Sequence, residues 1–115
     1  MNRPLLGLMT MTDRSYAYLR VKWIHSDLND PVLLYSELDE ERWEVRKVEV
    51  FADGHRGFAC ANESFGGSRL AEAVTPSVAE IAADVQFEPI EISRDEFERV
   101  WASRRNDGEP WRRHG

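Results

Sequence analysis

Apolar and polar residues alternate along the first half of the chain, and this pattern predicts β-strands. Leu19, Val21 and Trp23 share one parity between residues 16 and 25, and charged residues separate them. A period of two is typical of a strand with one buried face. Turn-forming residues separate this segment from an apolar run at residues 32–38, and further strands are indicated by alternation at residues 43–51 and by the hairpin signal before residues 55–61. The sequence therefore predicts four strands, at residues 16–25, 32–38, 43–51 and 55–61.

Two local signals refine this meander. In the third strand the apolar residues are at odd positions up to Val45 and at even positions from Val48 onward. A β-bulge near Arg46 and Lys47 would restore one apolar face. The pair Asp53-Gly54 predicts a tight hairpin between the third and fourth strands.

The second half of the chain changes to helical spacing. Ser93 followed by Glu96 forms a capping-box pattern, and Phe97 and Trp101 then lie on one face of a helix from residue 94 to about residue 104. A second helix is predicted after residue 75, with Pro76 in its first turn. We therefore expect an α+β domain: a four-stranded, mainly antiparallel sheet whose one face is packed by two short C-terminal helices.

Length and composition are consistent with one folded domain. The chain has 115 residues, of which 42% are hydrophobic and 31% are charged. Cys60 is the one cysteine, which excludes an internal disulfide. We predict a domain over residues 16–103, with a loose N-terminal extension at residues 1–15 and a frayed C-terminal tail at residues 104–115. No apolar run is long enough to span a bilayer, and no cleavage-site pattern of a secretory leader is present. These features favour a cytoplasmic protein.

Charge is concentrated in one part of the sequence. The chain has a formal net charge of −6 at pH 7, and residues 25–44 alone sum to −6. Such an acidic block repels nucleic-acid phosphates and attracts basic surfaces. It also has a simpler interpretation as a solvated turn. We therefore expect no nucleic-acid partner and no membrane partner, and we treat a basic protein as the candidate partner.

An aromatic residue within the acidic block gives the partner hypothesis its candidate site. Exposed next to the carboxylates, a tryptophan would suit an anchor for a basic partner. The candidate partner-binding residues are Glu37, Asp39, Glu40, Glu41, Trp43 and Glu44. The leading hypothesis is a small acidic binding protein, in its most specific form an immunity or antitoxin-like protein that neutralises a basic bacterial effector. The alternative is a small-ligand-binding domain or enzyme that uses the sheet and the Gly66-Gly67 loop.

Several weaker patterns in the sequence also have an ordinary structural interpretation. His25 precedes two aspartates at a strand end, but an ordinary strand-turn junction has the same pattern. Glu44 and Lys47 approach the carboxylate-x-lysine arrangement of metal-dependent nucleases, yet a regular strand would point them to opposite faces. Cys60 lies between alanines, as a buried structural cysteine does. We therefore predict no catalytic residues, no metal site and no cofactor.

The loop Gly66-Gly67-Ser68-Arg69 can be interpreted in two ways. Its backbone N–H groups and arginine would suit an anion. A glycine pair is more typical of a flexible connection.

Five segments together carry a family resemblance. In order they read YLRVKWIHSD, LLYSELDEERWEVRKVEVFADG, GGSRL, IAAD and EISRDEFERVW, and they span most of residues 18–101. The sequence resembles the family of small bacterial proteins known as domain of unknown function 6881. The resemblance implies a bacterial protein with one compact domain. It implies no activity, substrate or catalytic residue.

Overall fold

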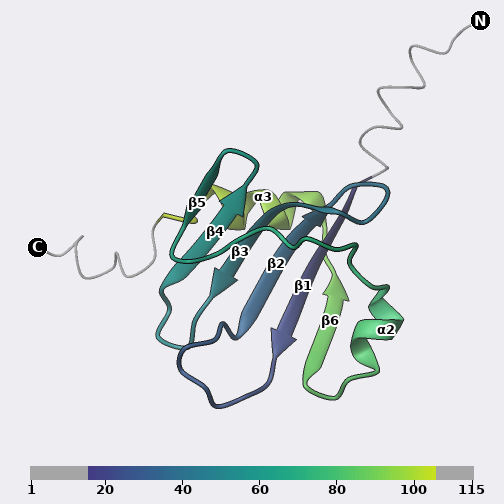
Figure 1. Ribbon diagram of the computed structural model, residues 1–115, viewed down its shortest axis with the longest axis horizontal. Coiled ribbons are helices and arrows are strands. Elements are labelled where there is room, and N and C mark those ends of the chain that lie inside the picture. The colour runs from purple at the N-terminus through teal and green to yellow at the C-terminus, as the bar shows by residue number, and fades with distance from the viewer. Residues whose placement is uncertain (1–15, 106–115) are drawn as a thin grey trace, which may run out of the picture.

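The predicted strands form the centre of an antiparallel sheet in the computed structural model, which describes residues 16–105 (Figure 1). Along the sheet the strand order is β5-β4-β3-β2-β1-β6, so the meander continues from β1 to β5 and β6 adds to the free edge of β1. The strands are β1 Ala17–Trp23, β2 Leu33–Leu38, β3 Glu44–Val50, β4 Arg56–Cys60, β5 Glu63–Phe65 and β6 Phe87–Glu91. The helices are α2 Val78–Ala82 and α3 Arg94–Ala102.

The expected number of strands was wrong, because the sheet in residues 16–105 has six strands and not four. The additional strands are the two edges. β5 has three residues, which is too short to show an alternating pattern, and it directly precedes the Gly66-Gly67 loop. β6 contains Pro89, which cannot donate a backbone hydrogen bond and therefore argues against a strand unless that strand is at an edge.

The parity change in β3 corresponds to the predicted bulge. Glu37 pairs with Arg46, but the next residue of β2, Leu38, pairs with Glu44, so Val45 is an extra residue in β3. Because of this extra residue, Glu44 and Lys47 lie on one face of the sheet. Arg46 lies on the opposite face with Val48.

The hairpin at Asp53-Gly54 is confirmed, with a different turn. Gly54 has a positive φ of 95°, whereas Arg42 is the one non-glycine residue of positive φ between residues 16 and 105. A type I′ turn would require positive φ at Asp53 as well. Instead the backbone N–H of Gly54 donates to Phe51, and the N–H of Phe51 donates to His55. These bonds are typical of a three-residue hairpin with glycine in its last position.

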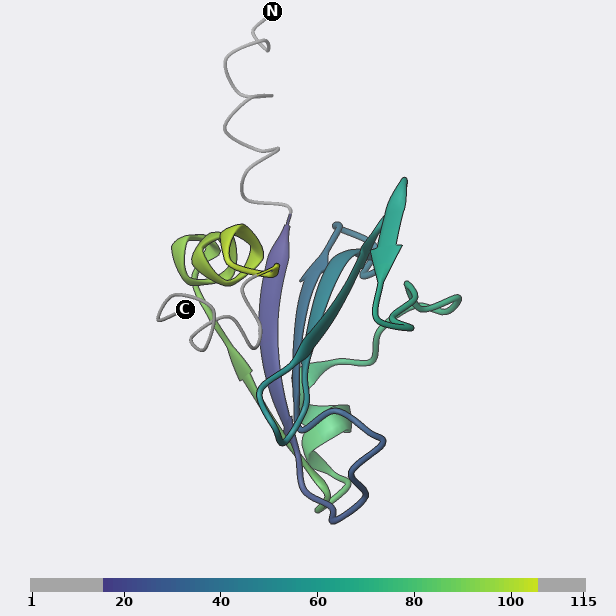
Figure 2. The same cartoon turned by 90° about the vertical axis from the view of Figure 1, so that its left-hand side faces the viewer.

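The two helices do not share one face of the sheet. α3 packs against β1, β2 and β3, whereas α2 contacts the edge strand β6. Figure 2 shows α2 and α3 on opposite sides of β1. The sequence indicates Thr75 as the cap of the helix that follows it, but the structure has Ser77 as the cap of α2, in a full capping box with Glu80, so Pro76 precedes the helix. Ser93 caps α3 as predicted, and its hydroxyl accepts a hydrogen bond from the N–H of Glu96.

The core lies on both sides of the sheet. The apolar spacing of the sequence predicts eleven buried residues, and five of them have 8% or less of their surface exposed: Leu19, Val21, Val48, Phe58 and Phe97. The others are half-buried, namely Trp23, Leu34, Val50, Ile81, Val100 and Trp101. Within residues 16–105 no helix combines the length and the apolar character that crossing a membrane requires. The predicted extension and most of the predicted tail lie outside the described residues.

Candidate functional site

Hydrogen bonds fix the backbone of the acidic turn between β2 and β3. One carboxylate oxygen of Asp39 accepts from the backbone N–H groups of Glu41 and Trp43, both at 2.9 Å. The guanidinium of Arg42 donates to the carbonyl oxygens of Thr75 and Pro76. The backbone N–H of Thr75 donates in return to the carbonyl of Arg42. Asp39 is therefore part of the turn structure and not a free charge.

Three of the six candidate residues are exposed on this turn. Glu40 and Glu41 are exposed, and Trp43 has 42% of its surface exposed. Within the described part of the chain, the side chains of Glu40 and Glu41 have no hydrogen bond or ion pair. The structure thus presents two unpaired carboxylates and a tryptophan ring on one fixed turn.

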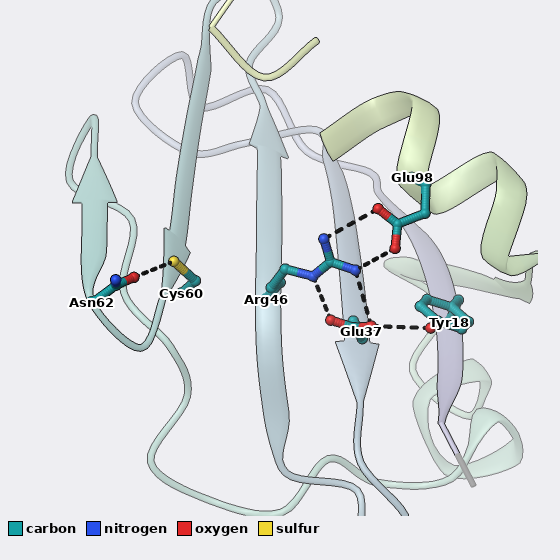
Figure 3. Close-up of polar contacts among 6 residues, drawn as sticks. All are labelled: Tyr18, Glu37, Arg46, Cys60, Asn62 and Glu98. Carbon is teal, nitrogen blue, oxygen red and sulfur yellow. Dashed lines mark hydrogen bonds and ion pairs between the residues drawn. The ribbon is translucent and has the colours of Figure 1, made fainter. Parts of the chain in front are cut away.

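Glu37 is buried under α3 instead of facing a partner (Figure 3). It has 6% of its surface exposed. Its carboxylate accepts two hydrogen bonds from Arg46 and one, at 3.0 Å, from the hydroxyl of Tyr18. Arg46 also donates to both carboxylate oxygens of Glu98, at 3.2 and 2.6 Å, and so connects β2, β3 and α3. The expectation that Glu37 belongs to a partner surface does not fit this position.

Aromatic rings complete the surroundings of Arg46. Its guanidinium lies over the rings of Phe97 and Trp101, at 5.0 and 5.1 Å from their centroids. The hydrogen bond with Glu37 raises the pKa of Arg46, and the bond from Arg46 lowers the pKa of Glu98. Burial, followed by the bond to Glu37, raises the pKa of Tyr18 to about 12. This network fixes α3 on the sheet, and two carboxylates share the single guanidinium of Arg46.

Glu44 belongs to a second polar cluster, on the opposite face of the sheet. Its side chain has 7% of its surface exposed, and it pairs with the ammonium of Lys47 at 3.3 Å. The same carboxylate accepts from the hydroxyl of Ser36 and from the backbone N–H of Ala71. Lys47 also lies 3.6 Å from Glu49. The bulge at Val45 therefore brings the carboxylate and lysine together, and the carboxylate of Glu44 also holds the segment after β5 through Ala71.

The glycine loop packs tightly on the same face. The hydroxyl of Ser68 donates to Glu49 at 2.7 Å, and Ser68 has 2% of its surface exposed. A side chain at Gly57 would collide with that hydroxyl, and one at Gly66 would collide with Gly57. Gly66 and Gly67 have φ values of 73° and 84°, which favour glycine. Ser68 next to a carboxylate is poorly placed to bind an anion.

The remaining candidates have local structural roles. The ring of His25 bonds to the carbonyl of Pro31 at 2.8 Å and accepts from the N–H of Asp27 at 3.0 Å, which closes the loop after β1. The thiol of Cys60 donates to Asn62 (Figure 3). In the part of the chain that the structure describes, no three His, Cys, Asp or Glu side chains are grouped as metal ligands would be.

An antiparallel sheet with two helices defines a small α+β protein. The sequence matches the family described as Domain of unknown function (DUF6881) over residues 17–106, and the chain belongs to this family. No curated protein and no solved structure matches the chain.

Proposed function

We propose that the chain is a binding protein that recognises a basic surface of another protein through the turn between β2 and β3. The observation that carries this proposal is the exposure of Glu40, Glu41 and Trp43 on a turn that Asp39 and Arg42 fix. A surface that is ordered before binding loses less conformational entropy on association. The carboxylates would steer a basic partner, and the tryptophan would supply buried contact area.

The specific role we propose is that of an immunity or antitoxin-like protein in the bacterial cytoplasm. Such a protein neutralises a basic effector by covering its surface. The net charge of −6 supports this role, because it accelerates association with a basic protein over long range. The structure adds that the charge available for contact is smaller than the sequence indicates, since Glu37 and Glu44 are paired internally.

Charge reversal on the turn tests the proposal. Tagged wild-type protein is used to capture partners from the source organism, and each captured protein is purified and its affinity measured. We expect Glu40→Lys with Glu41→Lys to weaken binding and to slow association, with a loss that shrinks as salt screens exposed charges. We expect Trp43→Ala to weaken binding by about tenfold, mainly through a faster dissociation rate. Asp39 stays unchanged, because its reversal would disturb the turn itself.

A matched variant separates local recognition from net charge. Glu88→Lys with Glu91→Lys changes the net charge equally, on the edge strand β6, which β1 separates from β2 and β3. This control should lose only the contribution of net charge to the association rate, and it should therefore bind more tightly than the turn variant does. Equal losses of affinity in both double variants would show that net charge, and not the turn, determines binding. Unchanged binding in the turn variant, or a captured set without basic proteins, would refute the proposed surface.

A further inference from the structure

A groove lies on the face of the sheet that carries α3, over the three strands β2, β1 and β6. Its volume is about 380 Å³, which lies within the range of ligand pockets. α3 covers the β1, β2 and β3 side chains near one end of the sheet, and the groove lies next to it. Its lining residues are Arg20, Lys22, Leu33, Tyr35, Glu88, Pro89 and Ile90.

Strand register arranges the groove as two rows across the three strands. Arg20 pairs with Tyr35 of β2 and with Ile90 of β6. Lys22 pairs with Leu33 of β2 and with Glu88 of β6. Both cations therefore stand on the central strand, about 7 Å apart along it because side chains of one face recur every two residues.

Polar groups in the groove have unused hydrogen-bonding capacity. Among residues 16–105, the side chains of Lys22 and Tyr35 form no hydrogen bond or ion pair. Arg20 makes one contact with Glu96, at 3.4 Å, and its side chain is 38% exposed. A guanidinium has five N–H donors, so most of its donors are available to a ligand.

Apolar side chains form the walls around these donors. Leu33 of β2 and Ile90 of β6 line the groove from opposite sides of β1, and Ile90 has 47% of its surface exposed. A ligand that covered this wall would remove apolar surface from water, which is favourable. Neighbouring apolar walls also strengthen a charge-assisted hydrogen bond by lowering the local dielectric.

We propose that this groove binds a small organic anion with an apolar body, a site separate from the acidic turn. Arg20 and Lys22 bind the anionic head group, and the hydroxyl of Tyr35 donates a third hydrogen bond. Glu88 sets the orientation, because its carboxylate shares the row of Lys22 and repels the head group toward the row of Arg20. The apolar body lies against Ile90 and its neighbours.

Titration with simple aromatic anions tests the site. Phenylacetate is added to ¹⁵N-labelled protein, and chemical-shift changes should map to β1, β2 and β6. The neutral phenylacetamide should produce much smaller changes at the same concentration, because it lacks the charge that Arg20 and Lys22 bind. Phenyl phosphate forms a second arm, and whichever anion binds more tightly identifies the preferred head group. A dissociation constant of about 1 mM is expected for so small a probe.

Single substitutions test which residues of the groove contribute to phenylacetate binding. Lys22→Met should weaken phenylacetate binding by about tenfold, and Glu88→Gln should strengthen it. Arg69→Met, an exposed cation in the loop on the opposite face, serves as the matched control and should leave binding unchanged. Spectra of each free variant verify the fold. Equal binding of phenylacetamide, shift changes confined to other strands, or an equal loss in Arg69→Met would overturn the proposal.

Discussion

Arg46 is the residue on which the contact between the sheet and α3 depends most. Its guanidinium bonds to Glu37 in β2 and to Glu98 in α3, and it stacks on two aromatic rings of α3. A buried ion pair contributes little compared with a well-packed apolar pair, but removal of one partner leaves a buried charge. Loss of one charged partner should therefore destabilise the protein more than replacement of both partners by apolar residues, and the free energy of unfolding measures this difference.

We expect Arg46→Met to lower the free energy of unfolding by about 3–5 kcal/mol, because Glu37 keeps a carboxylate with 6% of the residue's surface exposed. Urea denaturation measures the change. The double variant with Glu37→Met should recover part of the loss, since both charges are then absent. Arg20→Met is the control, because its ion pair is exposed and contributes at most about 1 kcal/mol. If Arg46→Met and Arg20→Met lowered the free energy of unfolding equally, the role of Arg46 would be contradicted.

The candidate site shows what a residue list can predict. Glu40, Glu41 and Trp43 are exposed as the partner hypothesis requires. Glu37 and Glu44 were included because they lie within the same acidic run. Their side chains point to opposite faces of the sheet, and each finds a cation there. The sequence shows how many charges a segment has. It does not show that Glu37 pairs with Arg46, because that contact depends on tertiary packing.

At the scale of elements, α3 depends on Phe97 for its position on the sheet. Phe97 is fully buried, and its ring lies 5.4 Å from that of Tyr18 and 6.4 Å from that of Trp101. The helix is short, with nine residues, and packing therefore stabilises it more than its own hydrogen bonds do.

Phe97→Ala should therefore cost about 3–5 kcal/mol of unfolding free energy, as expected for a large buried side chain. Ser93→Ala should cost about 1 kcal/mol through loss of the helix cap. Val85→Ala provides the control, because Val85 is 89% exposed and its truncation should change stability by less than about 0.5 kcal/mol. Thermal or urea unfolding measures the loss of stability in each of the three variants. A cost for Phe97→Ala as small as that for Val85→Ala would show that α3 does not dock.

Most elements could be predicted where the local pattern and the tertiary environment agree. β1 shows a clear alternation of apolar and charged residues, and the parity change in β3 predicted the bulge correctly. The edge strands escaped prediction. β6 reads FEPIE, and an internal proline removes the local signal although an edge position tolerates it. Which face α2 covers depends on where β6 returns to β1, which no local pattern specifies.

For the whole molecule, ionisation predicts a stability maximum between acid and alkaline limits. The pKa of Glu98 is lowered by its bond with Arg46, that of Asp53 by bonds with His55, and that of Glu80 by bonds with Ser77. A carboxyl whose pKa is lower in the folded state contributes stability above its unfolded pKa and loses it as the pH falls through the folded value. Unfolding free energy should therefore decrease below about pH 4.5.

Tyr18 determines the alkaline limit in the same way. Its pKa rises from 10.0 to about 12 in the folded protein, so folding favours the neutral phenol. That contribution is present below pH 10 and is lost as the pH rises toward 12. Urea denaturation across the pH range measures both limits. Tyr18→Phe should flatten the alkaline limit and Glu98→Gln should reduce the acid dependence. A profile that neither variant alters would contradict these assignments.

The place of β1 in the strand order also constrains how the chain folds during synthesis. β2 follows β1 directly, but the other neighbour of β1 is β6, so Leu19 finds its partner Glu91 only after most of the domain has left the ribosome. Until then β1 is an open edge, available for pairing with another chain. α3 follows β6 immediately, so residues 87–102 both close that edge and cover one face. Nascent chains halted before residue 87 should therefore be the ones that require a chaperone.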